Sequence, residues 1–263
     1  MMNILVCIKQ VPDVSKVEID RETNNLKREG VPSIINPCDL NALTAALKVK
    51  KQSKGKITVI SMGPPQASEA IREAIAMGAD EGYVICDGAF RGSDTLATSY
   101  VLSQGAKKLG PFDLVFAGTT TLDGDTGQVG PEIAEILGFA QATYVEDLEF
   151  ISDDKIKVIR NLENKIETGE LKVPALISIL RDSNEVKKAT KEEIEALKDL
   201  EIKTLTAKDL EAEEDRIGQK GSATVVAEVY PPKEIKKGQS IEGSVDEQVE
   251  GIIKVLKDYG FVK

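Results

Sequence analysis

The chain has 263 residues and a net charge of −10, with 44 acidic against 34 basic residues and no histidine. An acidic surface does not neutralise nucleic-acid phosphates, so we expect no nucleic-acid partner. The lack of histidine excludes Ser-His-Asp and Cys-His nucleophiles and removes the commonest metal ligand.

The three cysteines, Cys7, Cys38 and Cys86, are widely separated and form no C-x-x-C pair. This spacing predicts neither a metal site nor an iron–sulfur cluster built by this chain alone. Free thiols are typical of a reducing compartment. Because Met1 leads directly into a short apolar strand, we expect no signal peptide, and no apolar run reaches membrane-spanning length. We expect a cytoplasmic protein without membrane insertion.

The first half of the chain alternates short apolar strands with helices. Strands are predicted at residues 4–8, 57–60, 82–86 and 113–117, with a polar, hairpin-like excursion at 12–30. Helices are predicted from Asn36-Pro37, after Pro65, over residues 93–109, and from Val129 to Gly138. Repeated strand–helix units with continuously apolar strands indicate a doubly wound parallel sheet of the α/β class, covered on both faces.

The pattern changes after about Thr143. Short strands in a small β meander are predicted at 148–151, 155–159 and 165–168, followed by a buried strand at 174–180. Residues 184–215 are highly charged and include a predicted helix, residues 218–243 are rich in Gly and Pro, and residues 245–259 form an amphipathic helix. We interpret residues 1–183 as a nucleotide-binding α/β domain and residues 184–263 as an extended C-terminal interaction arm.

The loop from Gly118 to Gly130 joins a strand to a helix at the carboxyl edge of the predicted sheet, where such folds place ligands. Gly124 and Gly127 permit close approach of the backbone to a ligand. Free N–H groups at the helix start, together with Thr126 and Gln128, would cradle a pyrophosphate.

Two acidic residues in the same loop, Asp123 and Asp125, would repel a phosphate directly. We expect them to accept hydrogen bonds from backbone N–H groups or a ribose hydroxyl, or to cap the helix. The loop is neither G-x-G-x-x-G nor a P-loop, so the alternative is a glycine-rich turn with capping aspartates and no ligand.

Two further strand-to-helix junctions reach the same edge. Asn36-Pro37-Cys38-Asp39 opens a helix, with simple helix capping as the alternative interpretation. Met62-Gly-Pro-Pro65 is the other junction, with a rigid turn as its alternative. Because parallel topology gathers all three junctions at one edge, together they favour a ligand crevice.

Several motifs in order resemble the β subunit of electron-transfer flavoproteins. They are Ile4-Leu-Val-Cys-Ile-Lys-Gln-Val-Pro12, Gly30-Val-Pro-Ser-Ile-Ile-Asn-Pro37, Met62-Gly-Pro-Pro65, Ala76-Met-Gly-Ala-Asp80 and Asp123-Gly-Asp-Thr-Gly-Gln-Val-Gly-Pro-Glu132. The resemblance covers roughly the first 180 residues well and the tail more weakly. It implies an adenine-nucleotide α-hydrolase-like fold, paired with a larger α subunit that holds another FAD.

The resemblance also implies the cofactor-binding residues, with no catalytic side chain and no metal ligand among them. They are Cys7, Asn36, Pro37, Cys38, Asp39, Met62, Gly118, Thr119, Thr120, Thr121, Leu122, Asp123, Gly124, Asp125, Thr126, Gly127, Gln128 and Val129.

The family has two branches, one with structural AMP at this site and one, the electron-bifurcating branch, with a second FAD. Residues 24–37 and 124–132 are similar to the bifurcating branch. That similarity implies electron exchange with NADH, ferredoxin, the α-subunit flavin and a client flavin dehydrogenase. The alternatives are an AMP-holding, non-bifurcating subunit and a stand-alone adenine-nucleotide sensor. The long tail argues against the sensor.

The chain departs from the family pattern in two places. Thr119-Thr-Thr-Leu122 stands where relatives usually carry Lys/Arg-Gln-Ala-Ile, which removes a cation near the cofactor. Arg181-Asp-Ser-Asn-Glu-Val-Lys-Lys-Ala-Thr-Lys191 stands where relatives that dock acyl-CoA dehydrogenases usually read Leu-Asn-Glu-Pro-Arg-Tyr and an anchoring Leu. This second departure predicts a different client flavoprotein. A lactate-oxidising FAD dehydrogenase and an enoyl-CoA reductase are both open as candidates.

Overall fold

The computed structural model describes all residues except 14–17, 20–25, 28–31, 229–237, 239 and 263. The chain divides into two compact units, Met1–Val226 and Ala227–Lys263. Residues 184–226 therefore fold with the first unit. The role of the predicted arm in binding a partner stays a prediction.

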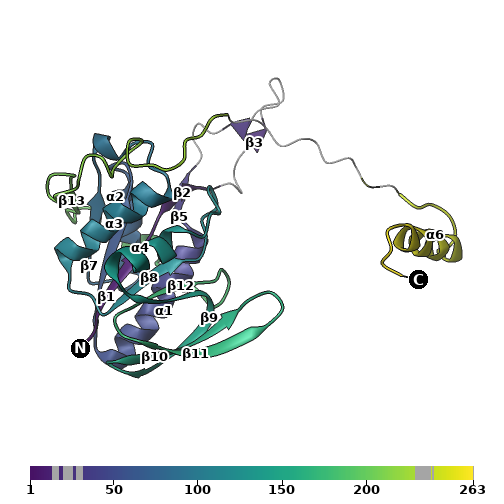
Figure 1. The fold of residues 1–263 in the computed structure, drawn as a ribbon, viewed down its shortest axis with the longest axis horizontal. Helices are drawn as coiled ribbons and strands as arrows, with labels where there is room; N and C mark the ends of the chain where they lie inside the picture. The colour runs from purple at the N-terminus through teal and green to yellow at the C-terminus, as the bar shows by residue number, and fades with distance from the viewer. Residues whose placement is uncertain (14–17, 20–25, 28–31, 229–237, 239, 263) are drawn as a thin grey trace. The chain divides into compact units, whose positions relative to one another are not determined.

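The first unit is built on one nine-stranded sheet (Figure 1). Its strands are β1 (Asn3–Cys7), β6 (Lys56–Met62), β7 (Glu81–Ile85), β8 (Leu114–Gly118), β9 (Ala140–Ser152), β10 (Lys155–Asn161), β11 (Ile166–Lys172), β12 (Ala175–Ile179) and β13 (Lys203–Leu205). They lie in the order β11-β10-β9-β12-β8-β1-β6-β7-β13. The pairs from β9–β12 to β7–β13 are parallel, and only the meander pairs β9–β10 and β10–β11 are antiparallel.

The sheet winds in two directions from its centre. From β1 the chain moves one way to β6 and β7, and then returns to β8 on the other side of β1 and continues to β12. In this arrangement Val6 pairs with Val59 on one side and with Phe116 on the other. The topological switch point therefore lies between β1 and β8, as the doubly wound fold class predicts.

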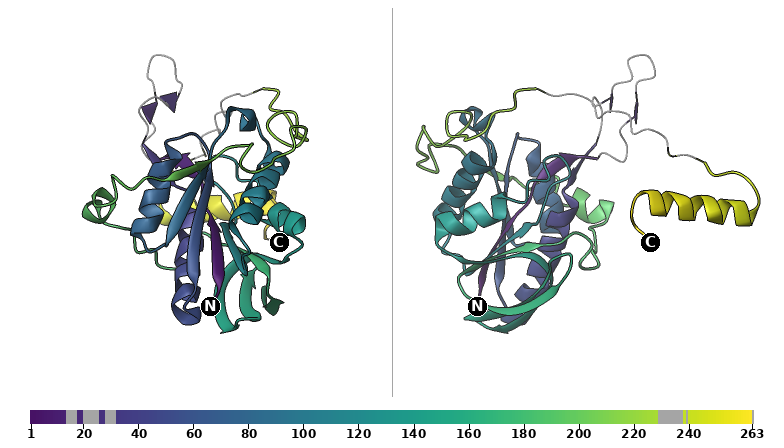
Figure 2. Two further views of the ribbon diagram at one scale, coloured as in Figure 1. Left: turned by 90° about the vertical axis from the view of Figure 1, so that its left-hand side faces the viewer. Right: turned by 45° about the vertical axis from the view of Figure 1, so that its right-hand side comes forward.

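Helices cover both faces of the sheet (Figure 2). On one face α1 (Pro37–Ser53) and α2 (Ala67–Ala76) pack in a cluster that includes Ile4 and Val6, and on the other α3 (Thr95–Leu109) and α4 (Val129–Leu137) pack with Leu5 and Cys7. Successive residues of β1 thus enter opposite cores, because side chains of a strand alternate between the two faces. This explains why the strand reads as an unbroken apolar run.

The second half of the unit differs in detail from the sequence prediction. The meander strands are longer than expected and extend the main sheet. Within the charged stretch 184–215 the only α-helix is the short α5 (Lys191–Glu195), and β13, which was not predicted, pairs with β7. Backbone pairing with the edge strand β7 decides this placement, and a strand of only three residues carries too little sequence pattern to be predicted.

The excursion after β1 contains two short antiparallel pairs, β2 (Gln10–Pro12) with β5 (Ser33–Ile35), and β3 (Glu18–Ile19) with β4 (Leu26–Lys27). These pairs agree with the predicted hairpin-like excursion. The rest of residues 12–30 lies outside the described residues, apart from Asp13.

The second unit contains α6 (Val245–Asp258), which confirms the predicted amphipathic helix. It begins with a capping box, in which the Ser244 side chain accepts the Glu247 N–H and the Glu247 carboxylate accepts the Ser244 N–H. Its apolar side chains are exposed within the described residues, among them Val249, Ile252, Ile253 and Leu256. Across the described part of the chain, no helix combines the length and the apolar character that a membrane crossing requires.

Candidate cofactor-binding site

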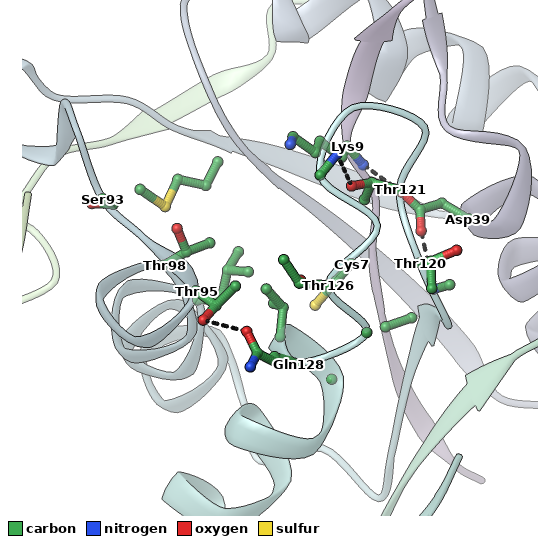
Figure 3. Close-up of a pocket in the computed structure, with 18 of the residues that line it drawn as sticks. Cys7, Lys9, Asp39, Ser93, Thr95, Thr98, Thr120, Thr121, Thr126 and Gln128 are labelled. Carbon is green, nitrogen blue, oxygen red and sulfur yellow. Dashed lines mark hydrogen bonds between the residues drawn. The ribbon is translucent and has the colours of Figure 1, made fainter. Parts of the chain in front are cut away.

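A cavity of about 400 Å³ opens at the carboxyl ends of β1 and β8 (Figure 3). This is the switch point of the sheet, where doubly wound proteins bind their ligands. Its volume lies within the usual range of small-molecule sites. Of the predicted site residues, those that line it are Cys7, Asp39, Met62, Gly118, Thr119, Thr120, Thr121, Gly124, Thr126, Gly127, Gln128 and Val129.

Asp39 ties the two central strands together at the floor of this crevice. One carboxylate oxygen accepts the Lys9 N–H at 2.8 Å, just beyond β1, and the other accepts the Gly118 N–H at 3.0 Å, at the end of β8. The side chain is buried, and burial raises the pKa of its carboxyl to about 7 although both hydrogen bonds favour the ionised form. Asp39 therefore shapes the crevice as well as lining it.

Asn36 holds the loop that follows β8. Its amide nitrogen donates to the Thr120 carbonyl at 2.8 Å, and its amide oxygen accepts the Leu122 N–H at 3.2 Å. Asn36 occupies the N-cap position of α1, with Pro37 at the first helical position, but its side chain makes no capping hydrogen bond. The capping interpretation is wrong for this side chain, because the loop backbone takes both of its polar groups.

The two loop aspartates do not cap α4, because that helix begins at Val129 after Gln128. The Asp123 carboxylate instead forms an ion pair with the Lys9 ammonium at 2.6 Å. Asp125 adopts φ of 49° and Gly127 φ of 66°, so the backbone passes through the left-handed region twice in three residues. Glycine reaches that region without the cost that a Cβ imposes, which accounts for Gly127.

Asn36, Pro37, Cys38, Leu122, Asp123 and Asp125 stand outside the cavity lining. Cys38 lies behind the loop, with its sulfur 4.0 Å from the Thr120 hydroxyl. Burial raises the pKa of the Cys38 thiol, and it raises the pKa of the Cys7 thiol to about 12. Neither sulfur is poised as a thiolate nucleophile, since such a thiol needs a lowered pKa.

Sequence analysis missed one wall of the cavity, the turn between β7 and α3. Phe90, Gly92, Ser93, Asp94, Thr95 and Thr98 line it. The Asp94 side chain caps α3 by accepting the Ala97 N–H at 3.1 Å, and it also accepts the Thr224 N–H at 2.8 Å. An aspartate just before a helix was the available signal, since that pattern marks an N-terminus and a fourth strand-to-helix junction at the same edge.

Two helix N-termini meet at the cavity. The Thr95 hydroxyl at the start of α3 bonds to the Gln128 side chain at 3.1 Å, at the start of α4 (Figure 3). Glu132 joins the same helices by accepting the Ser99 hydroxyl at 2.8 Å. The helix dipoles favour an anion there, and the start of α4 has no capping side chain of its own, so the arrangement suits phosphate groups. No group of three or more potential metal ligands occurs among the described residues.

Fold and cavity together define a doubly wound α/β protein with a cavity at its switch point, the place where this class commonly holds nucleotides and dinucleotides. The family model described as the electron transfer flavoprotein domain matches residues 23–210. That span covers more than half of the chain. The chain therefore belongs to the electron transfer flavoprotein family, on the β-subunit side, which confirms the family expected from its motifs.

Three relatives show the same relationship over nearly the full chain. An electron transfer flavoprotein subunit beta of Thermoanaerobacterium thermosaccharolyticum is 47% identical over 97% of this chain and 98% of its own. The caffeyl-CoA reductase-Etf complex subunit CarD of Acetobacterium woodii is 42% identical over 98% of each chain. Protein FixA of Azorhizobium caulinodans is 41% identical over 88% of this chain and 85% of its own.

Proposed function

We propose that this β subunit binds FAD in the cavity between β1 and β8 and passes electrons between NAD(H), ferredoxin and a client flavin dehydrogenase. The observation that carries the proposal is the convergence of the α3 and α4 N-termini on a switch-point cavity behind a glycine-containing loop. A diphosphate needs such a cradle of N–H groups.

The extent of the cavity favours FAD over AMP. The residues that the family resemblance assigns to the adenine nucleotide line the cavity at the ends of β1, β6 and β8 and in the loop that follows β8. The cavity continues past these positions along the turn from Phe90 to Thr98. This additional wall supports a ligand that extends beyond a mononucleotide.

The chain contributes binding and orientation, because the redox chemistry belongs to the cofactor. FAD supplies hydride and single-electron exchange when bound. Asp39 and Asn36 fix the strand ends and the loop, so the phosphate-binding N–H groups are held before the ligand arrives. No cavity side chain is needed as a general acid or base, since hydride transfer to a flavin depends on the stacking of two rings.

The partners are the electron-transfer flavoprotein α subunit, ferredoxin and a client dehydrogenase of the lactate or acyl-CoA type. A relative that belongs to a caffeyl-CoA reductase-Etf complex supports a client of the enoyl-CoA reductase kind. The residues at 181–191 keep the lactate-oxidising dehydrogenase open, because they depart from the motif that docks acyl-CoA dehydrogenases. Within the arm at residues 184–263, the exposed apolar face of α6 supports the part from Ala227 onward as the segment that contacts the α subunit.

The test is the cofactor content of the heterodimer purified from its native host. Two flavins per heterodimer, together with bleaching of the flavin absorbance by NADH, are expected. One flavin accompanied by AMP would establish the non-bifurcating alternative, and NADH would then leave the flavin oxidised. Co-purification of the client from the same host identifies the dehydrogenase.

A further inference from the structure

The loop from Thr119 to Val129 carries no cation of its own, only the two anions Asp123 and Asp125. A diphosphate brought to this loop adds further negative charge. Helix N-termini offset part of it, each being equivalent to about half a positive charge. A cationic side chain from another element would offset the remaining negative charge and strengthen the binding.

Among the lining residues that the structure describes, Lys9 is the only one with a cationic side chain. The two acidic lining residues, Asp39 and Asp94, both have their carboxylates occupied by backbone N–H donors. Lys9 lies two residues beyond the end of β1, and its own N–H donates to Asp39, which fixes its Cα at the edge of the crevice. Its ammonium lies beside the loop, as Figure 3 shows near Thr121.

We propose that the Lys9 ammonium binds the phosphate groups of the adenine cofactor and exchanges its partner Asp123 for them when the cofactor enters. The inference rests on the proposed function of the cavity. It supplies the cation that the Thr119–Leu122 segment lacks, from a different element and from the opposite side of the switch point.

The ion pair with Asp123 suits such an exchange. The pair is short, at 2.6 Å, but the side chains of Lys9 and Asp123 are 44% and 39% exposed. An ion pair this exposed contributes little to stability, so little free energy is needed to break it. An ammonium has three donors and no acceptor, and a phosphate oxygen is a stronger acceptor than water. Asp123 stands outside the cavity lining, so its carboxylate holds Lys9 at the rim until an anion arrives.

The experiment measures the binding of adenosine, AMP and ADP to the heterodimer after its β-subunit nucleotide has been removed. In the wild-type protein we expect ADP to bind more tightly than adenosine. Lys9→Met is expected to weaken ADP by roughly tenfold or more and to leave adenosine unchanged, because a charge-assisted hydrogen bond is lost. Lys9→Arg should retain most of the preference for ADP.

Asp123→Asn separates phosphate binding from a purely structural ion pair. If Lys9 binds phosphate, this variant binds ADP more tightly than wild type, because Lys9 loses its competing partner and an anion is removed from the rim. If Lys9 only fastens the loop, Lys9→Met and Asp123→Asn weaken adenosine and ADP alike, and the inference is wrong.

Arg91→Met is the matched control for the loss of one positive charge. Arg91 is exposed and does not line the cavity, although its neighbours Phe90 and Gly92 do. This variant should bind adenosine, AMP and ADP as the wild type does.

The outcomes also separate the proposed role of Lys9 from the proposed function of the cavity. A wild-type heterodimer that binds no adenine nucleotide overturns the function of the cavity, whereas one that binds ADP equally well after Lys9→Met overturns only the role of Lys9.

Discussion

The Asp39 carboxylate accepts the Gly118 N–H at 3.0 Å, which joins the first turn of α1 to the last residue of β8. The contact leaves no room for a side chain at position 118. A Cβ there would overlap the Asp39 carboxylate and lie 2.6 Å from the Cys38 Cβ. The switch-point crevice thus depends on a glycine for packing, although Gly118 lies outside the left-handed region.

Gly118→Ala is therefore expected to lower the free energy of unfolding by about 1–3 kcal/mol and to displace Asp39 from the strand ends, as overpacking does. Denaturant unfolding and the flavin content of the purified heterodimer measure the two effects. Gly124→Ala is the matched control in the same loop, where the nearest atom to an added Cβ is the Thr121 hydroxyl at 3.4 Å. Equal stability of the two variants would contradict the prediction.

Asp39 also predicts a pH dependence of stability. Its pKa is raised from an ordinary 3.8 to about 7 in the folded chain, mainly by burial, so between these values the folded state binds a proton that the unfolded state has lost. Its contribution to the free energy of unfolding is full below about pH 4 and is lost as the pH rises through about 7. Each unit of pKa difference corresponds to ~1.4 kcal/mol.

The measurement compares the wild-type protein with Asp39→Asn, which cannot titrate at this position. Denaturant unfolding of both at pH 5 and pH 7.5 should show the wild type losing stability relative to the variant at the higher pH. Other titrating groups cancel in the comparison when they lie far from position 39. A wild type whose stability relative to the variant stays constant over this range would show that the buried carboxyl is already ionised at pH 5, which contradicts the prediction.

The sequence predicted the central sheet well because each parallel strand is buried on both faces and reads as an apolar run. Strand β1 illustrates this, with Leu5 and Val6 both fully buried in opposite cores. Three of the strand-to-helix junctions around the crevice were also predicted from the sequence, because parallel strands bring their carboxyl ends to one edge of the sheet.

The remaining parts depend on contacts between distant segments, which local patterns do not contain. Asn36 has the residue type and position of a helix cap, yet its amide binds the backbone of Thr120 and Leu122 about 85 residues away along the chain. Strand β13 has only three residues and gains its conformation from pairing with β7. A propensity argument identifies neither, because tertiary pairing overrides it.

Gly127 provides a test of the loop conformation. Its φ of 66° is strained for any residue with a Cβ, at a cost of about 1–2 kcal/mol. Gly127→Ala is expected to lose the flavin of this subunit and to leave the α-subunit flavin in place, as counted by flavin extraction from the heterodimer. Gly138→Ala is the control at the other end of α4, with a φ of 68° and no atom within 4 Å of an added Cβ. It should show a similar loss of stability with the flavin retained.

The α6 helix yields a prediction for the second unit. Ile252 and Leu256 are 51% and 37% exposed in the described structure, on the face of a helix that also carries Val249 and Ile253. An amphipathic helix with an uncovered apolar face needs a surface to bury it, and we infer that the α subunit provides that surface. Ile252→Gln is expected to weaken association with the α subunit by roughly tenfold, since burial of such a side chain contributes about 1.5–3 kcal/mol.

Lys254→Gln is the matched control, because it changes a neighbouring residue of α6 outside that apolar set while introducing the same side chain. Sedimentation or titration of the separate subunits measures both variants. Helix content by circular dichroism should be the same in the two, so a difference in association reports the lost apolar contact. If both variants associate as the wild type does, the apolar face of α6 is not buried by the α subunit, and the arm must bind elsewhere.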